Sequence, residues 1–277
     1  MTDRQHPEAE HEYVLGTDRD ELVRLGFQHQ VWRGEAAAGW EAGGFGPGKA
    51  LLDVGCGPGY ATFDLAQLVG SRGRVHGVDA SARFVAELRA QAEGRGLANV
   101  SAEVGDVERL PLAAASFDGA YARWVLFVVS DPDAVVASVG RALRTGGTFV
   151  VHDYCHYEGA FVSPPAPVFA RGFRAVAESI RAHGGDPDVG AALPAMMRRH
   201  GLEPRSVRPI QRIARPGTAL WKWPETFFDN YFPSLVESGL LTEAERAEFM
   251  DGWHRRANDP ASFFWTPPMI EIVGVKG

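Results

Sequence analysis

Three glycines stand where an apolar segment gives way to a helix-forming one. Gly55, Gly57 and Gly59 directly follow the apolar segment 50–54. Glycine has no Cβ, so a glycine turn lets the backbone approach a ligand closely. Asp79 ends the next predicted strand, where its carboxylate can accept hydrogen bonds from both hydroxyls of a ribose. The spacing therefore predicts a binding site for a ligand that carries a ribose.

The glycine pattern differs from that of dinucleotide-binding proteins. A pyrophosphate site uses G-x-G-x-x-G, whereas residues 55–59 read G-x-G-x-G and follow an acidic residue, Asp53. A carboxylate at that position would repel a phosphate and suits a ligand with an ammonium group. The alternative is a tight turn that binds no ligand.

Titratable side chains cluster between residues 152 and 158, which read His-Asp-Tyr-Cys-His-Tyr-Glu. The cluster leaves a predicted strand at the edge of the sheet where the ligand is expected. We expect His156 to be the first candidate for a catalytic base and His152 the second, with Tyr154 orienting a substrate. The alternative is that these are solvated loop residues. No metal is expected, because the spacing is too local for a zinc site and the chain has only two cysteines.

Aromatic residues are dense between Trp221 and Trp265. Any one of these rings is most often part of a core. They are nonetheless more numerous than a small helical cap needs, so some are expected to wall a pocket for an apolar or aromatic molecule. The expected wall consists of Trp124, Phe127, Phe173, Phe228 and Trp265.

Strand and helix signals alternate between residues 50 and 154, which predicts an α/β fold with a parallel, doubly wound sheet and right-handed crossovers. The predicted strands are 50–54, 74–78, 100–104, 117–124 and 148–153, followed by two late strands at 206–214 and 269–275. A helix is expected over 189–199. The predicted units are lid helices over 1–45, a ligand-binding core over 46–158, cap helices over 159–205, and two final strands with an aromatic-rich helical insertion over 206–277.

Four motifs in combination resemble those of the class I S-adenosylmethionine-dependent methyltransferases, especially the small-molecule enzymes of ubiquinone biosynthesis and natural-product assembly. DVGCGPG (53–59) is similar to the family's first motif, and GVDAS (77–81) to its ribose-binding segment. GDVERLPLAAASFD (105–118) resembles the adenine-side motif, and LRTGGTFVVHD (143–153) the fifth-strand motif. The resemblance implies a Rossmann-like, seven-stranded, mostly parallel sheet with helices on both faces and a helical lid or cap.

The same resemblance implies which residues hold S-adenosylmethionine. The residues carried over are Asp53, Gly55, Cys56, Gly57 and Gly59 at the amino-acid end, Asp79 at the ribose, Ala80, Asp106 and Val107 at the adenine, Arg123 at the cofactor carboxylate, and Tyr13 and Gln28 in an N-terminal lid. For Tyr13 a hydrophobic staple is the alternative.

Composition and charge argue against several partners. Among 277 residues, 35 acidic side chains outnumber 28 basic ones, and the net charge is −7. The charges are interspersed without a basic stripe, so nucleic acid is not expected as a partner. The polar N-terminus does not read as a signal peptide, and the longest apolar run, 124–129, is too short for a membrane span. We expect a cytoplasmic monomer or homodimer.

These observations together predict S-adenosylmethionine-dependent methyl transfer to a small, largely apolar or aromatic acceptor, a secondary metabolite. Two alternatives stay open. One is an enzyme with the methyltransferase fold that catalyses a non-methylating reaction such as a cyclisation, and the other is a non-catalytic protein that binds the cofactor.

Overall fold

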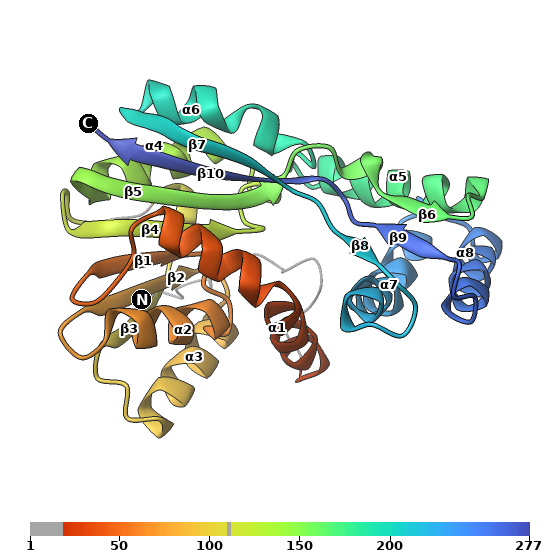
Figure 1. Ribbon diagram of the computed structural model, residues 1–277, viewed down its shortest axis with the longest axis horizontal. Helices are drawn as coiled ribbons and strands as arrows, with labels where there is room; N and C mark the ends of the chain where they lie inside the picture. Colours follow the sequence, from red (N-terminus) through yellow and green to blue (C-terminus); the bar gives the residue numbers. More distant parts are fainter. Residues whose placement is uncertain (1–18, 110–111) are drawn as a thin grey trace, which may run out of the picture.

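The central feature of the computed structural model, which describes residues 19–109 and 112–277, is a seven-stranded sheet (Figure 1). Its strands are β1 (Ala50–Val54), β2 (Arg74–Asp79), β3 (Val100–Val104), β4 (Phe117–Arg123), β5 (Leu143–Tyr154), β7 (Leu202–Ile210) and β10 (Met269–Lys276). The order is β3-β2-β1-β4-β5-β10-β7, and only β10 runs antiparallel to its neighbours. The predicted mostly parallel seven-stranded sheet is confirmed.

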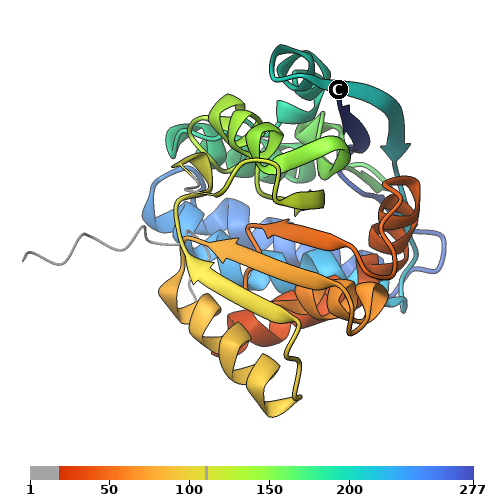
Figure 2. The ribbon, with the colours of Figure 1, turned by 90° about the vertical axis from the view of Figure 1, so that its left-hand side faces the viewer.

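Helices cover both faces of this sheet, as Figure 2 shows. On one face α1 (Arg19–Ala42) and α2 (Tyr60–Val69) pack on strand residues such as Leu51, Tyr121 and Val150, and α3 (Ala82–Gly94) packs beside α2. On the other face α4 (Pro132–Ala142) and α6 (Leu193–Arg199) pack on residues such as Leu52 and Phe149. Side chains alternate along a strand, so adjacent residues such as Leu51 and Leu52 point to opposite faces of the sheet and pack against different helices.

Local signals set the starts of α3 and α4. The side chain of Ser81 accepts a hydrogen bond from the backbone N–H of Phe84 and caps α3. Asp131 caps α4 in the same way through Ala134, and Pro132 occupies the first helical position.

Two expected elements differ in the structure. Strand β5 begins at Leu143 rather than at Thr148. The helix expected over 189–199 is divided into a short 3-10 turn, Val189–Ala191, and α6. Pro194 has no N–H and cannot continue a helix that began at 189, so it stands in the first turn of a new one. Helix α6 packs against α4 and β7 and thus belongs to the core rather than to the cap.

A separate cap lies at one end of the molecule, on the right of Figure 1. It contains α5 (Pro167–Ala182), α7 (Ala219–Glu237) and α8 (Glu243–Ala257). It also contains a small antiparallel sheet of β6 (Phe161–Ser163), β9 (Phe263–Trp265) and β8 (Ile213–Ala214), in that order. The sequence did not predict this sheet, because strands of two or three residues are too short to show a period of two.

Aromatic rings form the centre of the cap. Phe249 is fully buried and its ring centroid lies 4.7–5.8 Å from those of Phe169, Phe173, Phe228 and Phe232. Gly172 on α5 permits this packing, because a Cβ at that position would lie 2.5 Å from the Phe249 ring. The three helices of the cap therefore share one aromatic core.

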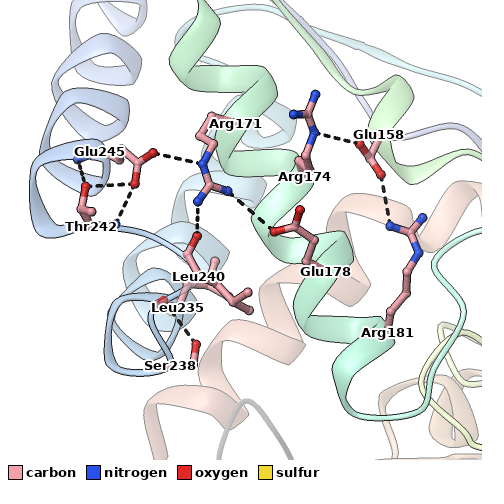
Figure 3. A network of polar contacts seen from close by, with 10 residues as sticks. All are labelled: Glu158, Arg171, Arg174, Glu178, Arg181, Leu235, Ser238, Leu240, Thr242 and Glu245. Atoms are coloured by element: carbon pink, nitrogen blue, oxygen red, sulfur yellow. Dashed lines mark hydrogen bonds and ion pairs between the residues drawn. The ribbon is translucent and has the colours of Figure 1, made fainter.

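Polar contacts hold α5 to the turn between α7 and α8 (Figure 3). The Arg171 Nε donates to Glu245 Oε1 at 3.0 Å, and its Nη2 donates to the carbonyl of Leu240. Glu245 also closes a capping box with Thr242 at the start of α8. Arg171 of α5 thus contacts the capping box at the N-terminus of α8.

None of the helices within the described residues combines the length and the apolar character needed to cross a membrane.

Removing the Phe249 ring tests the packing of the cap. Phe249→Ala should lower the free energy of unfolding by about 3–5 kcal/mol, because it leaves a cavity among four rings. Phe161→Ala is the matched control, since that ring is 42% exposed and its loss should cost less than about 1 kcal/mol. Urea denaturation followed by tryptophan fluorescence measures both. Equal effects of the two substitutions would contradict the packing described.

Candidate active site

The turn after β1 follows a path that suits glycine. Gly55, Gly57 and Gly59 have φ values of +65°, +52° and +95°, which L-residues with a Cβ rarely adopt. A Cβ on Gly55 would lie 2.4 Å from Val125, and one on Gly59 would lie 2.6 Å from Leu88. A Cβ on Gly57 would meet nothing within 4 Å. Gly59 therefore serves helix packing, whereas Gly57 borders open space.

That open space is a cavity of about 220 Å³ beyond the carboxyl ends of β1, β2 and β4, which we call the glycine-turn cavity. Strand order reverses between β1 and β4, and such switch points are where open α/β sheets bind ligands. The predicted cofactor contacts on its lining are Gln28, Asp53, Gly55, Cys56, Gly57, Asp79, Ala80, Val107 and Arg123. Three others differ: Gly59 is not on the lining, Asp106 borders the neighbouring cavity, and Tyr13 lies outside the described residues.

Two carboxyl groups face this cavity from the ends of β1 and β2. Asp53 is buried and accepts a hydrogen bond of 2.6 Å from the hydroxyl of Thr62, and burial raises its pKa to about 6. Asp79 accepts from the backbone N–H groups of Gly57 at 2.8 Å and Ser81 at 2.9 Å. Burial raises the pKa of Asp79 despite these bonds. Each oxygen of Asp79 keeps a lone pair for a ligand.

A guanidinium faces the same cavity from the end of β4. Nη2 of Arg123 lies 2.9 Å from Nδ1 of His29, and Nε2 of His29 lies 3.0 Å from Asp64. The other terminal nitrogen of Arg123, Nη1, is buried and has no hydrogen-bond partner within the described residues. A negative group (Asp53) and a positive group (Arg123) therefore line one end of the cavity.

A second cavity, of about 470 Å³, adjoins the first and opens towards the cap; we call it the aromatic cavity. Four of the five expected wall residues, Trp124, Phe127, Phe173 and Phe228, line it, and so does Tyr154. Trp265 does not, because it faces outward from the small sheet and is 40% exposed. Rings that the sequence did not single out complete the wall: Tyr157, Trp223, Phe227 and Phe264.

The two cavities share part of their lining. The shared residues are Gln28, Ala80, Val107, Trp124, Val128 and Val129. Trp124 has a φ of +56°, which is rare for a bulky residue and is found mostly at functional sites. Its ring lies between those of Tyr154 and Trp223, at centroid distances of 6.3 and 6.0 Å. Gln28 Oε1 accepts from the Trp223 indole N–H at 3.0 Å, so α1 joins this boundary.

The segment after β4, which carries much of this boundary, is fixed by a buried carboxyl. One oxygen of Asp153 accepts from the backbone N–H groups of Leu126 and Phe127 at 2.9 and 3.3 Å, and the other accepts from that of Tyr154. Burial raises the pKa of Asp153 to about 7. Asp153 thus positions the wall of the aromatic cavity.

The two histidines expected to act as bases line neither cavity. His152 is 1% exposed on the α1 side of β5, where its Nε2 lies 2.9 Å from Glu271 and its Nδ1 3.4 Å from the hydroxyl of Tyr121. Burial lowers its pKa. His156 is exposed at the start of a short 3-10 turn. The prediction that either histidine acts as a base at this site is therefore wrong. His152 is buried beneath α1, and His156 lies on the surface.

A histidine that the sequence analysis missed does border the aromatic cavity. His183 follows α5, and its Nδ1 lies 2.7 Å from the carbonyl of Ser179. A carbonyl only accepts, so Nδ1 carries the proton and Nε2 keeps the lone pair in the neutral ring. Within residues 19–109 and 112–277 no other hydrogen bond engages this side chain. Nothing in the sequence around His183 distinguishes it, because its position at the cavity depends on how the chain runs from α5 of the cap back to α6 on the core.

Within the part of the chain that the structure describes, no group of three or more His, Cys, Asp or Glu side chains could hold a metal ion.

Part of this chain is similar to known methyltransferases. Residues 46–181 match a family model described as a methyltransferase domain. Over 100 residues, 36% of this chain, it is 44% identical to the aklanonic acid methyltransferase DauC of Streptomyces sp. strain C5. The match covers 46% of that relative, so the chain spans less than half of its length.

Solved structures extend the likeness to almost the whole chain. Geranyl diphosphate C-methyltransferase from Streptomyces coelicolor A3(2) superposes with a TM-score of 0.60 and 17% identity, over 99% of this chain and 86% of that one. The [4+2]-cyclase SpnF superposes with a TM-score of 0.57 and 21% identity, over 87% of this chain and 80% of that one. At these identities the likeness concerns the fold.

Replacing Asp53 with asparagine isolates the cost of burying its charge. The carboxyl ionises near its ordinary value of 3.8 when the chain unfolds and at about 6 in the fold. Between these values the folded state holds a proton that the unfolded state has lost, so wild-type stability falls as pH rises. The stability of Asp53→Asn relative to wild type should therefore grow by roughly 3 kcal/mol between about pH 4 and about pH 7.

Asp118→Asn is the control, because the pKa of Asp118 is lowered rather than raised and its effect on stability should change with pH in the opposite direction. Burial opposes ionisation of Asp118, but hydrogen bonds from the Ala50 N–H and Arg144 lower its pKa. Its stabilising effect is present at neutral pH and is lost as pH falls, so this variant should lose most stability near neutrality. Denaturant unfolding at several pH values measures both variants. A pH-independent difference between Asp53→Asn and wild type would contradict the burial of this charge.

Proposed function

We propose that this chain, whose residues 46–181 match the model of a methyltransferase domain, transfers a methyl group from S-adenosylmethionine to a small apolar or aromatic acceptor, a secondary metabolite. The observation that carries the proposal is the pair of cavities with a shared boundary. One is polar at its inner end and the other is aromatic, as a cofactor and an acceptor of these two chemistries require.

The glycine-turn cavity fits the cofactor by charge. The buried carboxylate of Asp53 suits the ammonium group, and the guanidinium of Arg123, which lines the same cavity, suits the carboxylate. The free lone pairs of Asp79 suit the ribose hydroxyls. Glycine at 57 leaves the backbone open to the ligand. When bound, S-adenosylmethionine supplies an activated methyl group on a sulfonium.

The aromatic cavity supports an acceptor with a flat apolar body. Its volume of about 470 Å³ lies in the range of sites for small molecules. Trp124 and Gln28 border both cavities, so an acceptor against Trp124 lies next to the methyl donor. The surrounding rings exclude water and align the two reactants, which supports an in-line displacement.

Proton removal falls to His183 when the acceptor presents a hydroxyl. His183 lines the aromatic cavity and its Nε2 keeps a free lone pair, and Tyr154 lies on the same lining to orient the acceptor. Imidazole is the side chain used most often as a general base. We therefore place His183 in the role that the sequence analysis assigned to His156 and His152.

Cofactor binding tests the first half of this function. Calorimetry should show micromolar binding of S-adenosylmethionine and S-adenosylhomocysteine and none of NADH. Asp79→Ala should weaken both by about 10- to 100-fold, because the ribose loses a charged acceptor. Asp251→Ala, on the exposed side of α8, is the matched control and should change neither. Tight NADH binding without a response to the sulfur compounds would overturn the proposal.

Transfer of a tritiated methyl group to hydroxynaphthoquinones and hydroxyanthraquinones tests the second half. We expect labelled product, and His183→Asn should lower kcat by about 10²- to 10⁴-fold while the KM for S-adenosylmethionine is unchanged. Asparagine can still donate to the Ser179 carbonyl, so the local fold is kept.

His156→Asn is the control, since that ring lines neither cavity. An unchanged kcat in His183→Asn would refute the assignment of the base. Cofactor binding without transfer to any acceptor would favour a non-methylating enzyme or a cofactor-binding protein. The cytoplasmic location and the monomeric or homodimeric state stay predictions from the sequence.

A further inference from the structure

We propose that His29 is a positioning residue that fixes the guanidinium of Arg123 so that it meets the carboxylate of the S-adenosyl ligand. The inference rests on the proposed function and adds a residue that neither the motifs nor the family match contains, since His29 lies on α1, before residue 46.

The contacts determine the state of the imidazole. A guanidinium carries only donors, so Nδ1 of His29 accepts from Nη2 of Arg123 at 2.9 Å. Nε2 then carries the proton and donates to Asp64 at 3.0 Å. A ring that accepts at one nitrogen and donates at the other is neutral. Burial and the charge of Arg123 lower the pKa of His29, in agreement with this state.

Asp64 is itself held in place. Arg33 donates to both of its oxygens, at 2.6 and 3.0 Å, and the ring of Tyr60 stacks on His29 at a centroid distance of 6.2 Å. The pKa of Asp64 falls to about 2, because the hydrogen bonds from His29 and Arg33 outweigh burial. Asp64 therefore stays ionised and keeps the imidazole in one tautomer.

The consequence for Arg123 is directional. A guanidinium is planar, so a bond at Nη2 restricts the orientation of the whole group. Arg123 is partly exposed and lines the glycine-turn cavity, whereas its Nη1 is buried without a hydrogen-bond partner among the described residues. A carboxylate in the cavity would pair with the accessible part of the guanidinium and complete the site.

Two ligands that differ only at the amino-acid end test the inference. S-adenosylhomocysteine carries the carboxylate, whereas 5′-methylthioadenosine keeps the adenosine and the sulfur but lacks it. His29→Ala should weaken S-adenosylhomocysteine by about 10- to 100-fold, as loss of a charged hydrogen bond does, and leave methylthioadenosine within about twofold. His29→Asn should restore most of the affinity, because the amide oxygen takes the place of Nδ1 as acceptor.

A double-variant cycle shows whether His29 acts through Arg123. The double variant His29→Ala/Arg123→Ala should bind S-adenosylhomocysteine no more weakly than Arg123→Ala alone. Gln30→Ala is the matched control: Gln30 follows His29 on α1, but it is exposed and lines neither cavity, and its loss should change neither affinity.

The outcomes separate this inference from the proposed function. Equal weakening of both ligands by His29→Ala, or additive effects in the double variant, would show a merely structural role and overturn the inference while the function stands. Unchanged binding of S-adenosylhomocysteine by His29→Ala would overturn it as well. Failure of the wild type to bind either ligand would overturn the proposed function, and this inference with it.

Discussion

The parallel arrangement of β1, β2, β4 and β5 is the constraint on which the site depends. It brings the carboxyl ends of four strands to one edge, and the strand order reverses there between β1 and β4. Asp53, Asp79 and Arg123 reach one cavity because each stands at or next to such an end. Buried charges are expensive in a protein, and here their positions match the two charges of an amino-acid ligand.

Helix α1 lies between this edge and the cap, and its first half buries polar rather than apolar side chains. The buried residues of its first half are Glu21, Arg24 and His29, whereas Val23 is 67% exposed. An ordinary surface helix would bury apolar side chains instead. His29 faces the glycine-turn cavity, Arg24 the aromatic cavity, and Gln28 both. The helix therefore lines both cavities rather than only packing on the sheet, and it contacts both the core and the cap.

The sequence predicted the core well, because its signals are local. Strand β1 has the predicted bounds, since a buried run, a glycine turn and an amphipathic segment follow each other directly. The roles of His152, His183 and Trp265 could not be predicted in this way. His152 lies on the strand face that meets Glu271, Trp265 on the outer face of a sheet too short to recognise, and His183 where the cap returns to the core. Each depends on contacts between distant segments.

The central claim is that the glycine-turn cavity holds an S-adenosyl ligand with its amino-acid end between Asp53 and Arg123. A crystal structure of the wild-type protein with S-adenosylhomocysteine tests it most directly. The account expects the ammonium group beside Asp53, the carboxylate beside Arg123, the ribose on Asp79, and the sulfur facing the boundary at Trp124. A ligand bound in the reverse direction, or bound in the aromatic cavity instead, would contradict it.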